Sequence, residues 1–296
     1  MAEKVKRRRK RSYKREKKLN RSMAGNTLLF VLMGICGVAM AIPLVMLINN
    51  ALKPLDELFQ FPPKIFVRNP TLENFSDLFI LMNDTWVPFS RYMLNTIIIT
   101  GGGMIGHVII ASLAAYPLAK HNFPGKKILF QMVVLSMMFS WTVTQTPQYI
   151  IISWLGINNS YWALILPACA FGMGLYLMKQ FMETNVNDSV LESSRLDGAT
   201  EWKTFWVIAM PMVKPAWLTL IIYCFQGLWN AGSSIYIHSE QYKSFNYAIQ
   251  QITAGGIKRA GASAAAQVIM MMVPIAVFVI SQSNIIETMG SSGMKD

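Results

Sequence analysis

The sequence predicts an all-α integral membrane protein with six transmembrane helices, and three observations support this. First, 53% of the residues are hydrophobic and only 14% are charged, whereas soluble domains carry about 25% charged residues. Second, the apolar residues form six runs long enough to cross a hydrocarbon core about 30 Å thick, which takes about 20 helical residues. Third, such runs must be helical, because backbone groups in lipid find no water to bond.

The six runs are separated by segments that carry most of the charges. The third and fifth runs contain polar residues and are the least apolar. Small residues recur inside the runs, including Gly102 and Gly106 at a GxxxG spacing, which favours close packing of membrane helices. The predicted spans are Thr27–Ile48, Tyr92–Leu118, Lys127–Ile152, Trp162–Phe181, Pro211–Asn230 and Ala264–Ile285.

The net charge of +12 is concentrated at the N-terminus, where 12 of the 27 lysines and arginines lie in the first 21 residues. We interpret residues 1–26 as a basic cytoplasmic tail that is attracted to anionic lipid. Nucleic-acid binding is the alternative for such a tail, but a membrane lies beside this one. The first run has 22 residues, longer than the apolar core of a signal peptide (about 7–15), so we expect it to be retained.

The distribution of positive charge also predicts the topology. With the N-terminus inside, the cytoplasmic segments hold 20 lysines and arginines and the external segments hold seven. The positive-inside rule then places both termini in the cytoplasm, with 287–296 as the C-terminal tail. The membrane domain 27–286 has external loops at 51–91 and 233–263 and a cytoplasmic loop at 187–215. The prolines of the first external loop predict an irregular segment with short helices at most.

The cytoplasmic loop has the most informative pattern. Ser189 and Glu192 have the spacing of a capping box, which predicts that a short helix begins there. Gly198 is expected to end this helix, because glycine adopts the left-handed turn that other residues resist. A second short helix is predicted from Thr200 towards Trp206. A helix–turn–helix with apolar and charged faces suits docking to a cytoplasmic protein, and a helix lying on lipid head groups is the alternative.

The same loop contains a recognisable motif, composed of Glu192, Asp197, Gly198, Ala199, Phe205, Pro211 and Pro215. It resembles the EAA loop of binding-protein-dependent ABC importer permeases. The usual Glu-Ala-Ala opening of that family is Glu-Ser-Ser here. The likeness extends over nearly the whole chain after the basic tail and is closer to carbohydrate permeases of the maltose type. The segments behind this closer likeness are Asn49–Pro54, Asn95-Thr96, Ala114–Ala119 and Met289–Lys295.

The resemblance implies a type I ABC importer permease fold, in which the EAA loop forms a coupling helix that docks into a cleft of an ATPase subunit. Glu192 and Asp197 would cap the helix and pair charges at the docking surface. Gly198 would make the turn, Ala199 would allow close contact, and Phe205 would anchor the apolar side. The residues implied at the docking surface are Glu192, Ser193, Ser194, Asp197, Gly198, Ala199, Phe205 and Pro211.

The resemblance also implies the partners and the location. They are a second homologous permease, an ABC ATPase dimer and an extracellular or periplasmic solute-binding protein, in the cell membrane of a prokaryote. ATP and Mg²⁺ would be used by the partner ATPase. The chain itself is expected to have no catalytic site for ATP hydrolysis, because Phe123–Lys127 lacks the pattern of a phosphate-binding loop. It is also expected to bind no cofactor and no nucleic acid. The scattered cysteines and histidines predict no metal site.

The predicted function is import of a sugar or oligosaccharide by ATP-driven alternating access. Alternatives are a permease for another solute, a secondary transporter, and a membrane scaffold that transports nothing. A secondary transporter is disfavoured because no Asp or Glu lies within the later spans. Polar and aromatic residues at membrane depth include Trp141 and Tyr223. The candidates chosen among them for the substrate path are Gln145, Tyr149, Gln226, Trp229 and Asn230. Packing between helices is the alternative role for these five residues.

Overall fold

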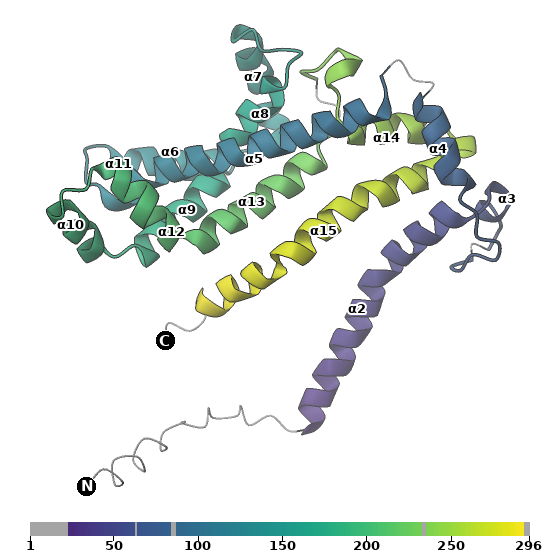
Figure 1. Ribbon diagram of the computed structural model, residues 1–296, viewed down its shortest axis with the longest axis horizontal. Helices are drawn as coiled ribbons and strands as arrows, with labels where there is room; N and C mark the ends of the chain where they lie inside the picture. The colour runs from purple at the N-terminus through teal and green to yellow at the C-terminus, as the bar shows by residue number, and fades with distance from the viewer. Residues whose placement is uncertain (1–22, 63, 84–86, 233–234, 293–296) are drawn as a thin grey trace.

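The computed structural model describes residues 23–62, 64–83, 87–232 and 235–292, and every regular element within them is helical (Figure 1). Most of the predicted basic tail and the last four residues fall outside these ranges. The helices that fall in the predicted membrane spans are α2 (Met23–Leu52), α5 (Phe89–Lys120), α6 (Lys126–Ser136), α7 (Trp141–Trp154), α8 (Trp162–Cys169), α9 (Gly172–Asn185), α13 (Lys214–Trp229) and α15 (Ala260–Ser292). The remaining elements are α3 (Leu55–Leu58), α4 (Glu73–Asn83), α10 (Asp188–Leu196), α11 (Glu201–Lys203), η2 (Thr204–Ala209), α12 (Met210–Met212), η3 (Glu240–Tyr242), α14 (Phe245–Ala254) and η4 (Ile257–Arg259).

The predicted membrane spans correspond to the longer helices. In the described ranges, four helices are long and apolar enough to cross a membrane, or up to six if each of two bent pairs forms one span. The first, second and sixth predicted runs are α2, α5 and α15, and the fourth is α8 with α9. The fifth is α13, which meets the short helices before it at 79°. The prediction of an all-α membrane protein is confirmed, and the sidedness of its termini stays a prediction.

The third predicted run, Lys127–Ile152, is not one straight helix, because α6 and α7 meet at an angle of 113°. The last turn of α6 tightens into i→i+3 hydrogen bonds, such as that from the Met138 N–H to the Leu135 carbonyl. Ser140 is extended, and α7 starts after it in a new direction. Neither glycine nor proline marks this break in the sequence, which is why the hydropathy pattern predicted a continuous span.

Helix α5 is the axis of the bundle, since α8, α9 and α13 all pack along it (Figure 1). Glycines make this approach possible. A Cβ atom on Gly106 would lie only 2.6 Å from Cys169 Sγ, and one on Gly102 would lie 2.9 Å from Ile165 Cδ1. The GxxxG spacing noted in the sequence therefore marks the face of α5 against which α8 packs.

A histidine is packed at the contact between α5 and α9. His107 is 1% exposed, and its Nδ1 lies 3.4 Å from the backbone oxygen of Cys169. Its ring fills the space beside Gly174, where a Cβ atom would overlap the imidazole. The contact depends on the absence of a side chain at Gly174.

The described part of the 51–91 segment is ordered by buried polar side chains. Asn74 of α4 donates a hydrogen bond of 2.9 Å to the Ala51 carbonyl at the end of α2. Glu57 of α3 is 8% exposed and accepts a hydrogen bond of 2.8 Å from the Arg68 N–H. These bonds satisfy backbone groups that no regular element pairs, so an irregular segment holds a definite shape.

The second predicted external segment packs on the first turns of α5. The Asn95 amide donates hydrogen bonds to the carbonyls of Gln241 and Lys243, each at 2.8 Å. The Asn95 carbonyl oxygen accepts a hydrogen bond from the Tyr161 hydroxyl at 2.7 Å. One fully buried asparagine thus joins α5, the start of α8 and the segment around η3.

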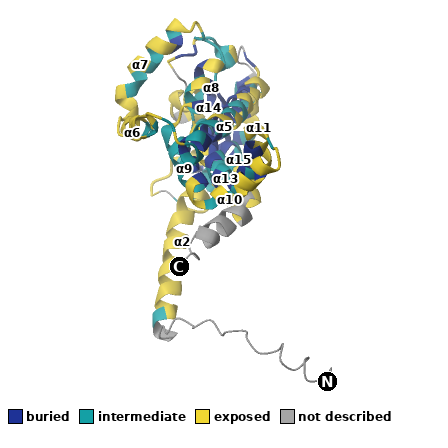
Figure 2. Cartoon of the chain, turned by 90° about the vertical axis from the view of Figure 1, so that its left-hand side faces the viewer, coloured by how far each residue is buried: buried dark blue, intermediate teal, exposed yellow. Residues whose placement is uncertain are grey.

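Helix α2 stands away from the other helices and contacts mainly α15 (Figure 1). Its side chains from Asn26 to Val45 are all exposed, and Figure 2 shows this helix almost entirely in the colour of exposed residues. An apolar helix with so little cover within its own chain requires lipid or another protein around it.

We expect Gly174→Ala to destabilise the bundle by about 1–3 kcal/mol, because the added methyl group overlaps the His107 ring and the packed core cannot expand without strain. Thermal unfolding of the purified protein in detergent measures this loss. Gly101→Ala is the matched control, because nothing lies within 4 Å of a Cβ atom at that position. Equal melting temperatures for the two variants would contradict the packing role of the His107–Gly174 contact.

Candidate functional site

The predicted cytoplasmic loop folds as a compact helical turn between α9 and α13, here called the elbow (residues 187–213). Helix α10 begins at Asp188, after an extended Asn187. The predicted capping box is therefore wrong: Ser189 already lies inside the helix, so its hydroxyl does not occupy the capping position. The second helix does begin as predicted, with Thr200 Oγ1 accepting a hydrogen bond from the Lys203 N–H.

Gly198 makes the turn between the two helices of the elbow. Its φ of +77° lies in the left-handed region, where other residues are strained. The Gly198 N–H donates to the Arg195 carbonyl and the Ala199 N–H to the Ser194 carbonyl, each at 3.0 Å. These two bonds form a Schellman motif, which closes the C-terminus of α10. The predicted turn is present, and a proline at this position cannot reach the required φ.

The inner side of the elbow is anchored to the end of α5. Phe205 is 2% exposed, and its ring centroid lies 5.3 Å from that of Tyr116. Ser194 is 5% exposed, and its hydroxyl is 2.7 Å from that of Thr204, so it joins α10 to η2. Ser194 was predicted at the docking surface, but its side chain points inward. The η2 segment is a π-helix, an irregularity often found at functional sites.

Ion pairs hold the two helices of the elbow together. Arg195 Nε bonds Glu201 Oε1 at 2.6 Å across the turn, and Tyr116 donates a hydrogen bond to the same carboxylate. Elsewhere Lys120 of α5 bonds Asp188 of α10 at 2.8 Å. Glu192 and Asp197, which were predicted to pair charges at the docking surface, form no ion pair with the described residues of this chain, and their pairing with a partner stays a prediction. Arg195 and Glu201 are six positions apart, so only the turn at residue 198 brings them together.

These pairs shift the ionisation of the groups involved. The hydrogen bond from Arg195 holds the pKa of the Glu201 carboxyl below its usual range, and the same bond raises the pKa of the Arg195 guanidinium. The hydrogen bond from Lys120 likewise lowers the pKa of Asp188. The shifts of Glu201, Arg195 and Asp188 all favour the charged form, so these ion pairs brace α10 against α11 and α5.

The outer side of the elbow carries two large, exposed apolar side chains among charged residues. Leu196 is 89% exposed and Trp202 is 63% exposed, at the end of α10 and in α11. The predicted docking residues Glu192, Ser193, Asp197 and Pro211 are also exposed, and Ala199 is partly buried. Figure 1 shows the elbow at one end of α5, whereas α3, α4 and α14 lie at the other end. Such a rigid apolar projection can bury area against a protein partner.

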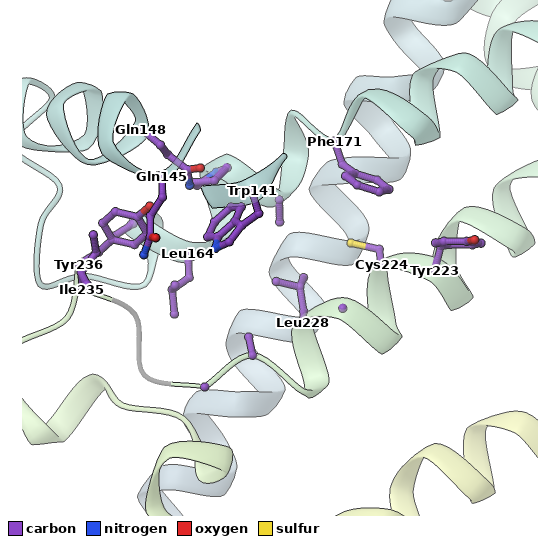
Figure 3. A pocket seen from close by; sticks show the side chains of 16 residues that line it. Trp141, Gln145, Gln148, Leu164, Phe171, Tyr223, Cys224, Leu228, Ile235 and Tyr236 are labelled. Carbon is purple, nitrogen blue, oxygen red and sulfur yellow. The ribbon is translucent and has the colours of Figure 1, made fainter. Parts of the chain in front are cut away.

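The substrate-path candidates divide into two groups in the structure. Gln145 lines a cavity of about 500 Å³ between α7, α8, α13 and the segment after α13. We call this cavity the Trp141 pocket, and Figure 3 shows its labelled lining residues. Tyr149 stacks on Tyr236 of its lining, with ring centroids 6.1 Å apart. Gln145 and Tyr149 are thus at or beside a cavity.

The other three candidates lie elsewhere. Trp229 is 2% exposed, stacks on Phe225 and donates a hydrogen bond of 3.1 Å from Nε1 to the Met270 carbonyl. It joins α13 to α15, which is the packing role left open in the sequence. Gln226 and Asn230 are exposed and do not line the Trp141 pocket, and the Asn230 amide bonds the carbonyl of Gln226.

Two polar residues of the lining, Gln148 and Tyr236, were not predicted from the sequence, and Trp141 and Tyr223 were noted there but not chosen as candidates. A readable signal existed for one of them. Trp141, Gln145 and Gln148 follow one another at spacings of four and three residues, which places them on one face of a helix. Tyr236 carried no such signal, since it reaches the pocket from an irregular segment. For metals, no cluster of three or more His, Cys, Asp or Glu occurs in the described ranges.

A family model, curated sequences and a solved structure all match this chain, and each of them belongs to a transport system or is similar to one. The family described as "Binding-protein-dependent transport system inner membrane component" matches residues 19–289. Protein LplC of Bacillus subtilis (strain 168) is 30% identical over 223 residues, covering 75% of this chain and 73% of the relative. The diacetylchitobiose uptake system permease protein NgcG of Streptomyces coelicolor is 24% identical over 195 residues, covering 65% and 62%.

A solved structure shows the same fold. A chain of a bacterial ABC transporter involved in the import of the acidic polysaccharide alginate superposes with a TM-score of 0.76 at 18% identity, covering 87% of this chain and 95% of that one.

The brace across the elbow turn is testable by a double-mutant cycle of Arg195→Gln and Glu201→Gln. Both side chains are about half exposed, 41% and 49%, so we expect a coupling free energy of only about 0.3–1 kcal/mol. Hydrogen exchange of the backbone amides of residues 198–204 measures it. Lys203→Gln, which removes an exposed charge outside the pair, is the control and should add no coupling.

The same cycle predicts a pH dependence. The folded pKa of Glu201 is depressed, so the coupling is fully present above the unfolded pKa of about 4.3 and is lost as the pH falls through the lower folded pKa. A cycle that shows no coupling at neutral pH contradicts the brace, as does one whose coupling survives after the carboxylate is protonated.

Proposed function

We propose that this chain, which belongs to the binding-protein-dependent transport system inner membrane component family, is the permease subunit of an ATP-driven carbohydrate importer. It is a multi-pass membrane protein, and we place it in the cell membrane of a prokaryote with both termini in the cytoplasm. The elbow carries this proposal, because it offers a braced apolar surface at one end of the bundle with no partner in the described chain.

The chemistry of the elbow favours a protein partner over a lipid surface. Helices that lie on membranes are rich in Lys and Arg on the polar face, which anionic head groups attract. Here the exposed Leu196 and Trp202 lie in an elbow with more acidic than basic residues, so anionic lipid repels it on balance. Its acidic residues are Asp188, Glu192, Asp197 and Glu201, and its basic residues are Arg195 and Lys203. A cytoplasmic ATPase subunit with an apolar cleft and basic rim is the partner that fits.

The remaining subunits follow from the same proposal. The motor must be a separate chain, because this sequence has no phosphate-binding loop, so ATP and Mg²⁺ are used by a pair of ATPase subunits. A second homologous permease covers apolar surface that this chain leaves exposed, including that of α2. A solute-binding protein docks at the opposite end of α5, on the segments around α3, α4 and α14.

Carbohydrate is the proposed cargo. Its support is the relative named for diacetylchitobiose uptake and the solved neighbour involved in alginate import. Import of another solute remains the alternative within the same machine. A secondary transporter differs in its energy source: its uptake survives depletion of ATP and stops when the ion gradient is removed.

The docking role of the elbow can be tested by adding an aspartate at either of two positions in α10, one on the docking surface and one as a control. Leu196→Asp should lower ATP-dependent uptake about tenfold, since a carboxylate replaces the most exposed apolar side chain of the docking surface. Ser189→Asp adds the same charge to the first turn of the helix, where it suits the helix dipole, and should leave uptake near the parental rate. Radiolabelled sugar uptake by cells that make the whole importer is the measurement.

Crosslinking gives an independent result. A cysteine at position 196, made by Leu196→Cys, should capture the ATPase subunit, whereas Leu72→Cys at the other end of the bundle should not. Equal uptake by the two aspartate variants, together with no ATPase capture from position 196, would sink the docking role of the elbow. Uptake that persists without ATP would sink the importer itself.

A further inference from the structure

We propose that the segment after α2 is a lipid anchor, whose apolar side chains enter the membrane surface at the end of that helix. The segment comprises the described residues 55–62 and 64–69 and is here called the α3 loop. In the predicted topology this surface belongs to the outer leaflet. The inference depends on α2 crossing the membrane and goes beyond the proposed cargo and motor. Its support is the burial pattern of the loop, its attachment to α2 and its cations.

The α3 loop and the residue before it bury charged side chains. Lys53 is buried and donates hydrogen bonds to the side-chain oxygen of Asn50 and to the carbonyl of Lys64. The buried carboxylate of Glu57 accepts a hydrogen bond of 2.8 Å from the Arg68 N–H. Two charges are thus used to hold the backbone of an irregular segment.

The outer surface of the same loop is apolar. Phe61 is 92% exposed and Phe66 is 73% exposed. Three more apolar side chains of the loop are about half exposed, namely Leu55, Phe59 and Ile65. In water, burying charges and exposing phenylalanines both cost free energy, so a water-facing loop has the opposite arrangement. Five such side chains within 12 positions indicate an apolar surrounding.

The loop is fastened to the last turn of α2. Helix α3 begins three residues after α2 ends, and the returning chain bonds back, with the Thr71 N–H donating to the Leu52 carbonyl at 2.9 Å. The bond from Lys53 to the Lys64 carbonyl ties the middle of the loop to the same place. Figure 1 shows α3 beside this end of α2. Because α2 is the most apolar of the four single-helix spans, its end marks the membrane surface, and the loop is held there.

Two cations flank the apolar side chains of the second half of the loop. Lys64 precedes Ile65 and Phe66, and the exposed Arg68 follows them. Aromatic rings beside lysine and arginine are typical of segments in the membrane interface, where the cations meet lipid phosphates. Among the described residues of the loop, the exposed carboxylate is that of Asp56, which lies in α3.

The competing occupants of this surface are proteins. The proposed solute-binding protein has to leave after each delivery, which would return five apolar side chains to water in every cycle. A second permease would stay, but lysine is depleted in the buried cores of protein interfaces. Lipid is always present and accommodates the rings and the cations together. The binding protein then docks on the part of this end formed by α4 and α14.

The test uses the complete importer in vesicles of phosphatidylcholine and phosphatidylglycerol, with one spin label at a time. The label is attached after Phe61→Cys or Phe66→Cys, and after Gln250→Cys in α14 as the control, since that residue is exposed at the same end of the bundle. Oxygen collides with labels in lipid, and a water-soluble nickel chelate collides with labels in water. The native cysteines are first changed to alanine at Cys36, Cys169 and Cys224.

We expect the nickel collision rate at positions 61 and 66 to be about tenfold lower than at position 250, because a polar chelate is excluded from an apolar layer. The oxygen collision rate should be higher at 61 and 66 than at 250. Both rates should stay the same when the loaded binding protein is added.

A second measurement needs no substitution and therefore holds even where a variant fails to fold. A phosphatidylcholine with a diazirine close to the head-group end of its acyl chain is activated by light in the same vesicles. Mass spectrometry of the unmodified chain should find the lipid on Phe61 or Phe66 and not on Gln250.

Nickel-accessible labels at 61 and 66 overturn the inference, because the loop then faces water. Labels shielded from both oxygen and nickel also overturn it, because a protein then covers the loop. That protein is the second permease if the shielding is constant, and the binding protein if it appears only on docking. A loop free of the lipid photolabel overturns the inference as well. The proposed importer stands in all these cases, since its failure is measured separately, by ATP-dependent uptake.

Discussion

The close packing of α8, α9 and α13 on α5 is the constraint on which the rest of the structure depends. Small residues and the buried His107 bring the helices together at the middle of α5, where lipid offers no hydrophobic driving force for association. The two ends of α5 carry the functional anchors. Tyr116 and Lys120 bond the elbow, and Asn95 bonds the segment around η3. One rigid helix therefore holds both ends of the molecule in a fixed relation.

Much of this architecture is readable in the sequence because membrane insertion constrains composition strongly. Local residue types predict the six apolar runs, the turn at Gly198 and the helix capped by Thr200. The bend before α7 does not, since hydropathy measures which residues lie in a span and carries no information about its direction. The Arg195–Glu201 pair was hidden for a related reason: its partners meet only across a turn whose geometry the sequence spacing leaves open.

The candidate sites illustrate the same division. Phe205 was predicted from its motif to anchor the apolar side of the loop and was counted with the docking residues, but it is buried against Tyr116, and its part in docking stays a prediction. Trp229 was grouped with the substrate path because an aromatic residue beside amides suits sugar binding. Its indole instead bonds the Met270 carbonyl between two helices. Residue type alone cannot separate these roles, because the same groups serve hydrogen bonding between helices and binding of a ligand.

The connection between the elbow and the Trp141 pocket follows from the order of elements along the chain. The elbow ends at Val213, fully buried, and α13 begins at the next residue, so any displacement of the elbow acts directly on α13. This helix supplies Tyr223 and Leu228 to one wall of the pocket. The opposite wall is α7, which contacts Tyr236 through Tyr149 and lies beyond the bend from α6. Helix α13 packs on α5, α9 and α15, and α7 is not part of that packing, so a displacement of α13 changes the distance between the two walls. The same geometry that exposes Leu196 to a partner therefore connects that partner, through α13, to the Trp141 pocket beside which Gln145 and Tyr149 lie.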